Sequence, residues 1–599
     1  MAGKVLELET ILTPDTLGCE IARNYQTWEN ARAVKVREWQ EIQQYIFATD
    51  TTKTSNAKLP WSNKTTIPKL CQIRDNLHAN YIASMFPRRQ WMKWEGEEAH
   101  DETYSKVETI ENYMRWVADR NEFYDEMVKA VYDYIDYGNV FVMPEWVDKT
   151  QTAAGNKKER VGYVGPVFRR ISPLDIVFNP TSPSFLEAPK IIRSYISIGE
   201  VQEMIEANSF PEDQREDAKL LIDYMLEVRS NCSSHVGTTI TKDALYDIAG
   251  FDSFSDYLSS STVELLTFYG DIYDVNTRTY LRNHEIRVVD RHKLLSKRPN
   301  PSYFGAAPIY HAGWRVRPDN LWAMGPLDNL VGMQYRIDHL ENLKADVFDL
   351  TALPVLKIKG HVEDFDWGPF ERIYCGDSGD VVPITIDSQV LSADTQIKEL
   401  EAKMEEMAGS PREASGFRTP GEKTMYEVQR LELAAGRIFQ NKINQFERQI
   451  TENILNAMLE LARRMVDKTT IRVFDTELKI ADFRIVSAED ITGAGRIKPV
   501  AARHFAERSL KVQDLNNFFN SRAGSDPAIL MHFSSTKLAK MWEELLNLDD
   551  DQIVMPFIRI SEQADAAKMQ ASAQQDVAMV SSTPTNHLPG DADPALLNG

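Results

Sequence analysis

The chain of 599 residues carries 89 acidic and 68 basic side chains, so its formal net charge at pH 7 is −21. This excess argues against a protein that wraps nucleic acid tightly, because such binding depends on neutralising phosphates with lysine and arginine. Hydrophobic residues make up 43% of the sequence and charged residues 26%, which excludes a mostly disordered chain. The length allows several domains.

No targeting or membrane segment is predicted. The first ten residues lack the apolar core of a signal peptide, and nowhere do 18 apolar residues run together. The four cysteines, Cys19, Cys71, Cys232 and Cys375, contain no CxxC pair, so neither a zinc site nor a disulfide framework is predicted. A reducing, intracellular origin is favoured.

The first 320 residues are predicted to form helices and then strands. Apolar residues at helical spacing predict four helices: Asp15–Phe47, Lys69–Met85, Asp101–Arg120 and Glu122–Tyr137. Runs rich in β-branched and aromatic residues, punctuated by proline and glycine, predict strands: residues 140–147, 162–171, 174–179, 191–198, 263–274 and 284–291. Two further helices are expected among these strands, near Ile198–Asn208 and Glu212–Val228.

The stretch from Pro326 to Met465 is central to the interpretation. It begins with a predicted helix that ends before Pro354 and has one apolar stripe: Leu327, Leu330, Met333, Ile337, Leu340, Leu343, Val347 and Leu350. A small β unit is predicted from the runs PVLKIKG, RIYCG and DVVPITI. A shorter, acidic helix follows, from about Ser392 to Met407.

A long helix from Thr424 to Met465 is the clearest prediction, since apolar residues recur every three or four positions and no proline interrupts them. At 1.5 Å per residue, an unbroken helix of this length spans about 60 Å. Such a helix usually crosses more than one domain or packs against other copies of the chain. A bent core helix of a large all-α domain is the alternative.

The loop before this helix, GFRTPGEKT (residues 416–424), nearly matches a phosphate-binding loop. In that motif lysine directly follows the last glycine, whereas here Glu422 intervenes, and an acidic helix precedes the loop where a strand is required. Nucleotide hydrolysis is therefore not predicted. The loop is interpreted either as a flexible segment whose basic residues touch a phosphate backbone transiently or as an ordinary connection between helices.

The acidic clusters are interpreted as solvated faces and helix caps. Asp364 and Asp366, the run 549–551 and the glutamates of residues 392–407 could supply Mg²⁺ ligands only if oxygens converged from several segments. No zincin, serine-hydrolase or Cys–His pattern occurs. The sequence therefore predicts no catalytic residue, no metal ligand and no cofactor.

After the long helix, residues 470–475 and 483–495 are predicted to form strands and a loop. Residues 500–560 return to a helical pattern. At least the last dozen residues are expected to be disordered, because the tail is rich in Ala, Gln, Ser and Asp.

In this order of parts the chain resembles the portal, or head-to-tail connector, protein of tailed double-stranded DNA bacteriophages, with a short-tailed phage as the expected source. Four stretches carry the resemblance: DYGNVFVMPEW (136–146), RRISPLDIVFNPTSPSF (169–185), LWAMGPLDNLVGMQYRIDHLENLKADVFDLTALPVL (321–356) and the loop-to-helix stretch ending TMYEVQRLELAAGRIFQ (424–440). It covers about residues 15–560 and is strongest from 320 to 465.

The resemblance implies an α+β, predominantly α protomer of portal type, with wing, stem, clip and crown regions, that assembles into a ring. The implied regions are an N-terminal part of the wing at 1–320, a first stem helix within 321–352 (from about Pro326 to Ala352), a clip at 353–391, a second stem helix at 392–408, a tunnel loop at 409–423, a long wing helix at 424–466, wing strands at 467–504, a crown at 505–565 and a flexible tail at 566–599.

Portal proteins are not enzymes. The resemblance implies a ring of twelve copies at one capsid vertex, through which double-stranded DNA is packaged and ejected. The implied partners are other copies of the chain, the DNA, the large terminase, tail adaptor proteins, and the capsid and scaffolding proteins, with no membrane. The implied location is the virion and, during assembly, the host cytoplasm.

The expected site residues fall into three groups. Arg412, Arg418 and Lys423 of the tunnel loop are the hypothesised DNA contacts. The stem and oligomer interface is expected to contain Leu327, Leu330, Ile337, Leu340, Leu343 and Val347. The clip contributes Lys357, Lys359, Asp364, Asp366 and Trp367.

Two alternatives remain open. The first is a nucleotide- or metal-dependent DNA-processing enzyme of the packaging machinery, with the loop near Gly421 as its active site. The second is a coiled-coil scaffold protein without a channel, built on Thr424–Met465.

Overall fold

The computed structural model describes residues 4–8, 13–47, 65–86, 91–96, 101–152, 159–206, 219–223, 225–226, 262–302, 304–352, 355–362, 373–384, 393–408, 439–475, 480–499, 515, 538 and 541–542. The chain divides into two compact units, Met1–Val473 with Phe483–His504, and Phe474–Asp482 with Phe505–Gly599. Apart from the ends of β15 and β16, every element below belongs to the first unit.

The chain is of mixed α and β structure, as predicted. Its named helices are α1 (Pro14–Phe47), α3 (Lys69–Met85), α4 (Asp101–Arg120), α5 (Phe123–Asp136), α6 (Ile198–Glu206), α10 (Val331–Ala352), α11 (Asp394–Ala408), the π turn η3 (Glu447–Thr451) and α13 (Glu452–Met465). Its strands are β1 (Val5–Leu8), β2 (Met92–Gly96), β3 (Asn139–Thr152), β4 (Glu159–Ile171), β5 (Ile176–Phe178), β6 (Lys190–Ser197), β7 (Thr262–Asp274), β8 (Tyr280–Val289), β9 (Lys293–Pro299), β10 (Tyr310–Gly313), β11 (Arg315–Arg317), β12 (Asn320–Met324), β13 (Leu356–Lys359), β14 (Asp380–Pro383), β15 (Lys468–Asp475), β16 (Ile480–Ser487) and β17 (Gly495–Pro499).

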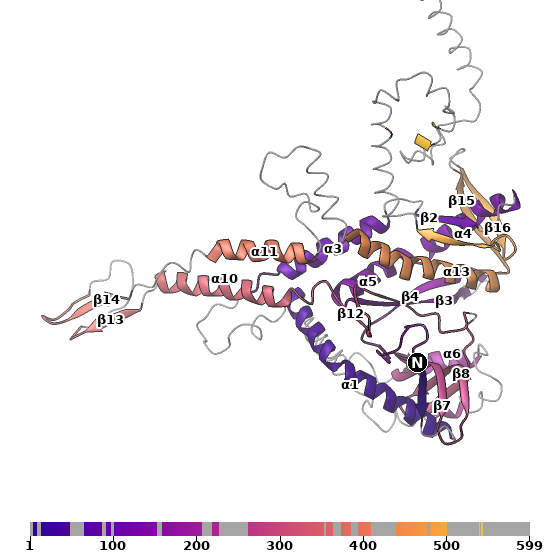
Figure 1. Ribbon diagram of the computed structural model, residues 1–599, viewed down its shortest axis with the longest axis horizontal. Coiled ribbons are helices and arrows are strands. Elements are labelled where there is room, and N and C mark those ends of the chain that lie inside the picture. Colours follow the sequence, from indigo (N-terminus) through magenta and orange to yellow (C-terminus); the bar gives the residue numbers. More distant parts are fainter. Residues whose placement is uncertain are drawn as a thin grey trace, which may run out of the picture. The chain divides into compact units, whose positions relative to one another are not determined.

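One sheet has the antiparallel order β5-β6-β7-β8-β9, and β1 pairs in parallel with the end of β7. Helix α1 packs along this sheet (Figure 1). Its side chains Leu17, Ile21 and Tyr25 share one core cluster with Phe268 and Ile286 of the strands. Removing this apolar surface from water holds helix and sheet together.

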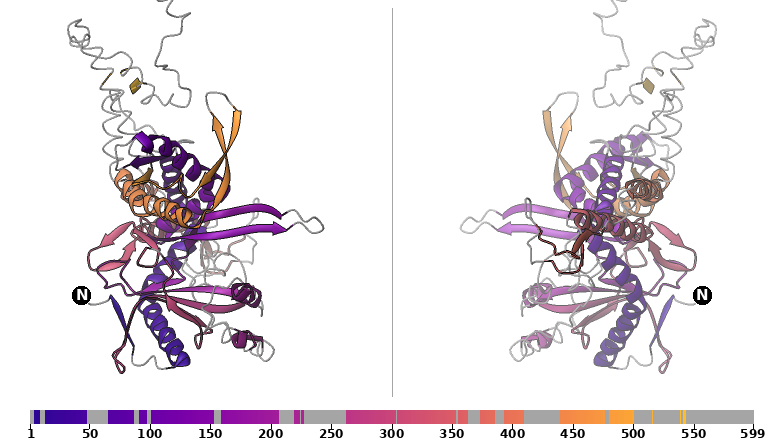
Figure 2. Two further views of the ribbon diagram at one scale, coloured as in Figure 1. Left: turned by 90° about the vertical axis from the view of Figure 1, so that its right-hand side faces the viewer. Right: turned by 90° about the vertical axis from the view of Figure 1, so that its left-hand side faces the viewer.

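A second sheet has the order β10-β3-β4, and Figure 2 shows β3 and β4 as a long purple ribbon that extends beyond the neighbouring strands. The base of the ribbon packs with α3, α5 and α13 in the largest core cluster. In this cluster the ring of Tyr134 meets Phe446 edge-on, with centroids 5.0 Å apart, and Tyr81 meets Phe439 in the same manner at 4.9 Å. Such edge-to-face pairs add to the stabilisation from burial.

Two buried carboxylates tie α5 to its neighbours. Asp133 accepts two hydrogen bonds from the Arg170 guanidinium of β4, at 2.5 and 2.6 Å. Asp136 accepts two from Arg74 of α3, at 2.7 and 2.8 Å. Because each charge is paired in a bidentate geometry, the cost of removing it from water is offset in part, although burial still raises the pKa of both carboxyl groups. Neither partner can be lost alone without a large penalty.

Helix boundaries follow local chemistry. The side chains of Ser197 and Glu200 form a reciprocal capping box at the start of α6, with hydrogen bonds of 3.2 and 2.6 Å to each other's backbone nitrogens. Glu122 has a φ of +59°, in the left-handed region, and separates α4 from α5. A continuous helix is impossible at such a residue.

The predicted long helix is described over residues 439–465 and is helical there, but not as an uninterrupted α-helix. The π turn η3, which contains the buried Ile450, lies between the upstream buried residues Ile443 and Phe446 and the downstream residues Leu455 and Met458. At 3.6 residues per turn, a regular α-helix would turn the downstream set away from the upstream set by roughly 100°. The extra residue of a π turn restores a common buried face. Residues 424–438 lie outside the described part of the chain.

In the ranges that the structure describes, no helix combines the length and apolar character needed to cross a membrane.

Candidate functional site

The helical hairpin, defined here as α10, β13, β14 and α11, is the part of the structure that corresponds to the predicted stem and clip. Its two helices lie side by side, and the small sheet β13–β14 lies at their end (Figure 1). The second helix begins at Asp394, within two residues of the prediction. The first begins at Val331, five residues after the expected Pro326, because residues 326–330 form turns between strand β12 and the helix.

The start of the hairpin is held by a close backbone contact. Gly138, which follows α5, has a φ of +67°, and a Cβ atom there would lie 2.3 Å from the backbone nitrogen of Gly325. Gly325 immediately precedes the turn into α10. Glycine is therefore required at position 138 both by its backbone conformation and by the lack of space.

The base of α10 is anchored by polar contacts to residues 65–70. The amide nitrogen of Gln334 donates to the carbonyl of Ile67 at 2.5 Å and to Asp338 at 2.9 Å. Asp338 accepts the backbone N–H of Ile67 at 3.0 Å, and Asn342 exchanges two hydrogen bonds with the backbone of Thr65, at 2.7 and 2.9 Å. These hydrogen bonds hold the segment before α3 against one side of α10.

Asp338 is a buried carboxylate with no ion pair among the described residues, and its Oδ2 has no hydrogen-bond partner there. Burial raises the pKa of Asp338 to about 6, although the hydrogen bonds from Ile67 and Gln334 oppose that rise. The base of the hairpin therefore contains a carboxyl group that is protonated in mildly acidic solution.

Two ion pairs connect the hairpin helices to each other and to the core. Lys344 of α10 contacts Asp394 of α11 at 2.7 Å, in an exposed pair. Lys69 of α3 contacts Glu405 of α11 at 2.7 Å, and both of these side chains are largely buried. The second pair is shielded from solvent and is expected to be the stronger of the two.

The stem residues predicted to form an oligomer interface are placed mainly inside the chain itself. Leu327, Leu330 and Ile337 are fully buried, and Leu340 and Val347 are nearly so. Leu327, Leu330, Ile337 and Leu340 belong to the largest core cluster, and α10 packs against α3 and α11, which explains the apolar stripe without a second copy. Of the six, only Leu343 is exposed, at 39% of its surface.

A different set of apolar side chains on the hairpin is open to solvent. Nine of the 21 exposed large apolar side chains among the described residues belong to this hairpin and the short segments adjoining its strands. We call them the exposed apolar set: Tyr335, Leu343, Phe348, Val355, Ile358, Tyr374, Val382, Ile384 and Met407. Exposed apolar residues gathered in this way usually indicate an interaction surface.

The sheet β13–β14 has only two strands and open edges on both sides within the described residues. Lys357 pairs with Val382 and Ile358 with Val381, so the ribbon carries apolar side chains on both faces. The predicted clip residues Lys357 and Lys359 are exposed on it. A two-stranded ribbon is marginally stable by itself, and open edges accept further strands.

Several predicted residues lie outside the described ranges. These are the clip residues Asp364, Asp366 and Trp367, the tunnel-loop residues Arg412, Arg418 and Lys423, and nearly all of the predicted crown. Among the residues that are described, no three His, Cys, Asp or Glu side chains are grouped as metal ligands would be.

The two helices of the hairpin and the small β unit between them occur where the sequence predicts them. The apolar stripe at helical spacing marks the buried face of α10, whereas Tyr335 and Phe348 lie off that stripe. Large apolar residues that fall outside the helical repeat, such as these two, are the sequence feature that indicates an exposed apolar surface.

No protein-family model matches this chain, and no curated protein matches its sequence.

Proposed function

We propose that this protein is the portal protein of a tailed double-stranded DNA phage, assembling into a ring of about twelve copies at one capsid vertex. In this proposal α10 and α11 are the stem helices, β13–β14 belongs to the clip, and η3 with α13 is the end of the long wing helix. Strands β15, β16 and β17 follow as wing strands. The order of these elements along the chain supports the assignment.

The observation that carries the proposal is the exposed apolar set of the helical hairpin. A ring places the same hairpin of neighbouring copies side by side, so that side chains such as Phe348 and Ile358, each 55% exposed in one chain, become covered. The open edges of β13–β14 are suited to pairing with a further strand. Burial between copies removes an exposed apolar surface that is costly for a monomer.

The charge of the chain is consistent with a channel for DNA. With a net charge of −21, the ring would repel phosphates on average, and DNA could then move without being held firmly. Arg412, Arg418 and Lys423 of the tunnel loop are proposed to steady the DNA. Replacing all three with alanine is expected to reduce packaging and leave the ring intact, whereas loss of the ring would assign the loop a structural role.

In the same proposal the clip docks the large terminase during packaging and the tail adaptor afterwards, and the capsid and scaffolding proteins surround the ring. The protein would reside in the virion and, before that, in the host cytoplasm.

Negative-stain electron microscopy of the purified full chain, with light scattering for the mass, tests the proposal. Closed rings with a central hole and about twelve lobes are expected. Monomers or rods at every concentration would contradict it. ATP hydrolysis, or Mg²⁺-dependent cleavage of DNA, would favour a DNA-processing enzyme.

A variant pair tests whether the exposed apolar set makes the ring. Leu343→Ser combined with Phe348→Ser is expected to abolish rings, because both side chains lie on the hairpin. Val275→Ser is the control, since Val275 is 51% exposed but follows β7 in the wing region. If the double variant still formed rings, the exposed apolar set would not be part of the interface between copies.

A further inference from the structure

A cavity of about 230 Å³ lies between α1 and the β11–β12 hairpin. Its apolar wall contains Trp28, Phe178 and Trp322. Trp322 stacks on Phe178, with ring centroids 4.5 Å apart and an angle of 22° between the rings, so the wall is rigid and aromatic. Such a wall favours a flat apolar group, and the volume is smaller than that of pockets for drug-sized ligands.

Arg32 of α1 brings a fixed positive charge to this cavity. Its guanidinium donates to the carbonyls of Pro173 and Ile176, each at 2.6 Å, and of Leu174 at 2.9 Å. It lies 5.5 Å from the ring centroid of Trp322. Its Nε is buried without a hydrogen-bond partner, and no carboxylate forms an ion pair with it among the described residues. Three neutral oxygens therefore orient the group, and the carboxylates of Glu29 and Asp175 act on its charge without forming an ion pair with it among the described residues.

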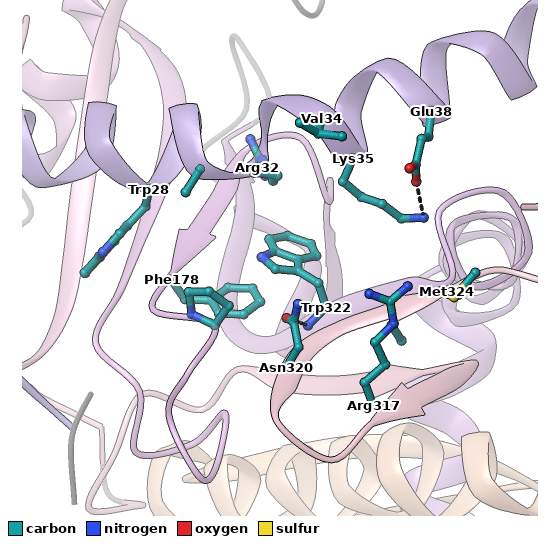
Figure 3. Close-up of a pocket in the computed structure, with 13 residues that line it drawn as sticks. Trp28, Arg32, Val34, Lys35, Glu38, Phe178, Arg317, Asn320, Trp322 and Met324 are labelled. Atoms are coloured by element: carbon teal, nitrogen blue, oxygen red, sulfur yellow. Dashed lines mark hydrogen bonds and ion pairs between the residues drawn. The ribbon is translucent and has the colours of Figure 1, made fainter.

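Two further cations point into the same space. Figure 3 shows Lys35 extending from α1 and Arg317 from β11 toward the region beside Trp322. Lys35 is already paired, with Glu38 at 2.8 Å and with Asp328. Arg317 has neither a hydrogen bond nor an ion pair in the described part of the chain, and its side chain is exposed at the mouth of the cavity. Among the described residues, the cation of this cavity without a counter-ion is thus Arg317.

We propose that this cavity binds a small aromatic anion, namely one planar ring system that carries a carboxylate or a phosphate. The ring packs among the aromatic side chains, and Arg317 holds the acid, with the fixed charge of Arg32 attracting it from the other side. Guanidinium groups suit this task because their planar donors match both kinds of oxyanion. A neutral ring would gain the apolar contact but would leave Arg317 unpaired.

The test uses the full chain and three probes that share a benzene ring: phenylacetate, phenyl phosphate and the neutral phenylacetamide. Binding is followed by the fluorescence of the tryptophans excited at a wavelength where the probes do not absorb, and by titration calorimetry. At least one anion is expected to bind saturably, with a Kd at least about tenfold lower than that of the amide. A difference of this size corresponds to one charge-assisted hydrogen bond. The stronger of the two anions identifies the acid. Equal binding of the amide, or no binding of either anion, would overturn the proposal.

A matched pair of variants locates the site. Arg317→Gln is expected to weaken anion binding by about tenfold or more. Arg315→Gln removes the same charge from the same strand, but Arg315 lies over the ring of Trp314, 5.2 Å from its centroid, and does not line the cavity. That variant should bind as the unaltered protein does. Equal losses in both variants would show a general effect of charge and would refute the assigned site.

Discussion

In the core around α5, the buried carboxylates are paired with arginines and the large apolar side chains are almost completely covered. The helical hairpin, by contrast, contains the carboxylate of Asp338, which has no ion pair among the described residues, and leaves many apolar side chains exposed. Tyr134 and Phe446 illustrate the first region, and Phe348 and Ile358 the second. The two regions share α3, which packs against both α5 and α11. A single chain therefore contains one region whose apolar surface is already buried and one region whose exposed apolar surface is suited to contact with other molecules.

The comparison separates stability from assembly. Substitutions in the core around α5 should change the free energy of unfolding of the single chain, because covered groups lose their partners. Substitutions in the exposed apolar set should leave that quantity nearly unchanged and alter association. Two pairs of substitutions test the distinction, and two buried titratable groups then add a dependence on pH.

The largest loss is expected from Asp136→Ala in the core. The change leaves the Arg74 guanidinium buried without its bidentate partner, and we expect the free energy of unfolding to fall by about 3 to 5 kcal/mol. Asp75→Ala is the control, since Asp75 contacts the same guanidinium at 3.5 Å but its side chain is 58% exposed. Its loss should stay below about 1 kcal/mol. Urea unfolding followed by circular dichroism measures both, and equal losses would contradict the role given to burial.

Two leucine-sized residues of the same helix give the next contrast. Ile337 of α10 is fully buried and Leu343 is 39% exposed. Ile337→Ala is expected to cost about 2 to 4 kcal/mol through the cavity that it leaves. Leu343→Ala should cost less than about 1 kcal/mol in protein diluted to monomers. If the two substitutions had the same effect on unfolding, the buried and exposed sides of α10 would have been assigned incorrectly.

A buried lysine predicts a pH dependence of the core. The ammonium group of Lys190 donates to the carbonyls of Phe185 and Leu186, at 2.8 and 3.2 Å, and burial lowers the pKa of Lys190 to about 7. Between about pH 7 and pH 10 the unfolded chain binds this proton and the folded chain does not, so folding stability rises with pH across that window. Lys190→Met lacks this titration.

Relative to the unaltered protein, Lys190→Met should therefore lose stability on going from pH 7 to pH 10, by on the order of 2 kcal/mol. Chemical unfolding of both proteins at each pH gives the difference directly. A difference that is the same at both pH values would show that Lys190 titrates normally.

The smallest effect, and one of opposite sign, is expected at the base of the hairpin. The raised pKa of Asp338, about 6, means that the folded chain binds more protons than the unfolded chain between about pH 4 and pH 6. The unaltered protein should therefore gain stability as pH falls through this window. Asp338→Asn keeps an acceptor for the N–H of Ile67 and lacks the titration.

The advantage of Asp338→Asn at pH 7 is expected to be about 1 kcal/mol, after allowance for solvent screening, and to disappear by pH 4. Thermal midpoints at several pH values measure it. The variant would contradict the prediction if its advantage grew on acidification.

Much of the local structure could be predicted from the sequence, because helical spacing is a property of neighbouring residues. Helix α3 begins and ends at the predicted residues Lys69 and Met85, and α1 differs from its prediction by one residue. Strands β3, β4 and β7 also occur where β-rich runs were found.

The remainder depends on contacts between distant segments. Strand β2 pairs with β17, so Trp94 lies opposite Ile497, some four hundred positions later in the chain. Nothing in the sequence of either strand indicates its pairing partner. The sequence also does not reveal that α3 and residues 65–68 cover the apolar stripe of α10, on which an oligomer interface was predicted. The cavity beside Trp322 escaped notice for the same reason, since α1 and β11–β12 contribute its cations separately.

The π turn before α13 makes the length of this helix adjustable. Because the turn at Glu447–Thr451 holds one residue more than an α turn, deletion of a single residue there would convert it to a regular turn. In an ordinary α-helix the same deletion would rotate one half against the other by about 100° and expose its apolar face. Here the surplus residue can absorb the loss, so a homologous chain one residue shorter at this point could retain both buried faces and the packing of Phe446 against Tyr134.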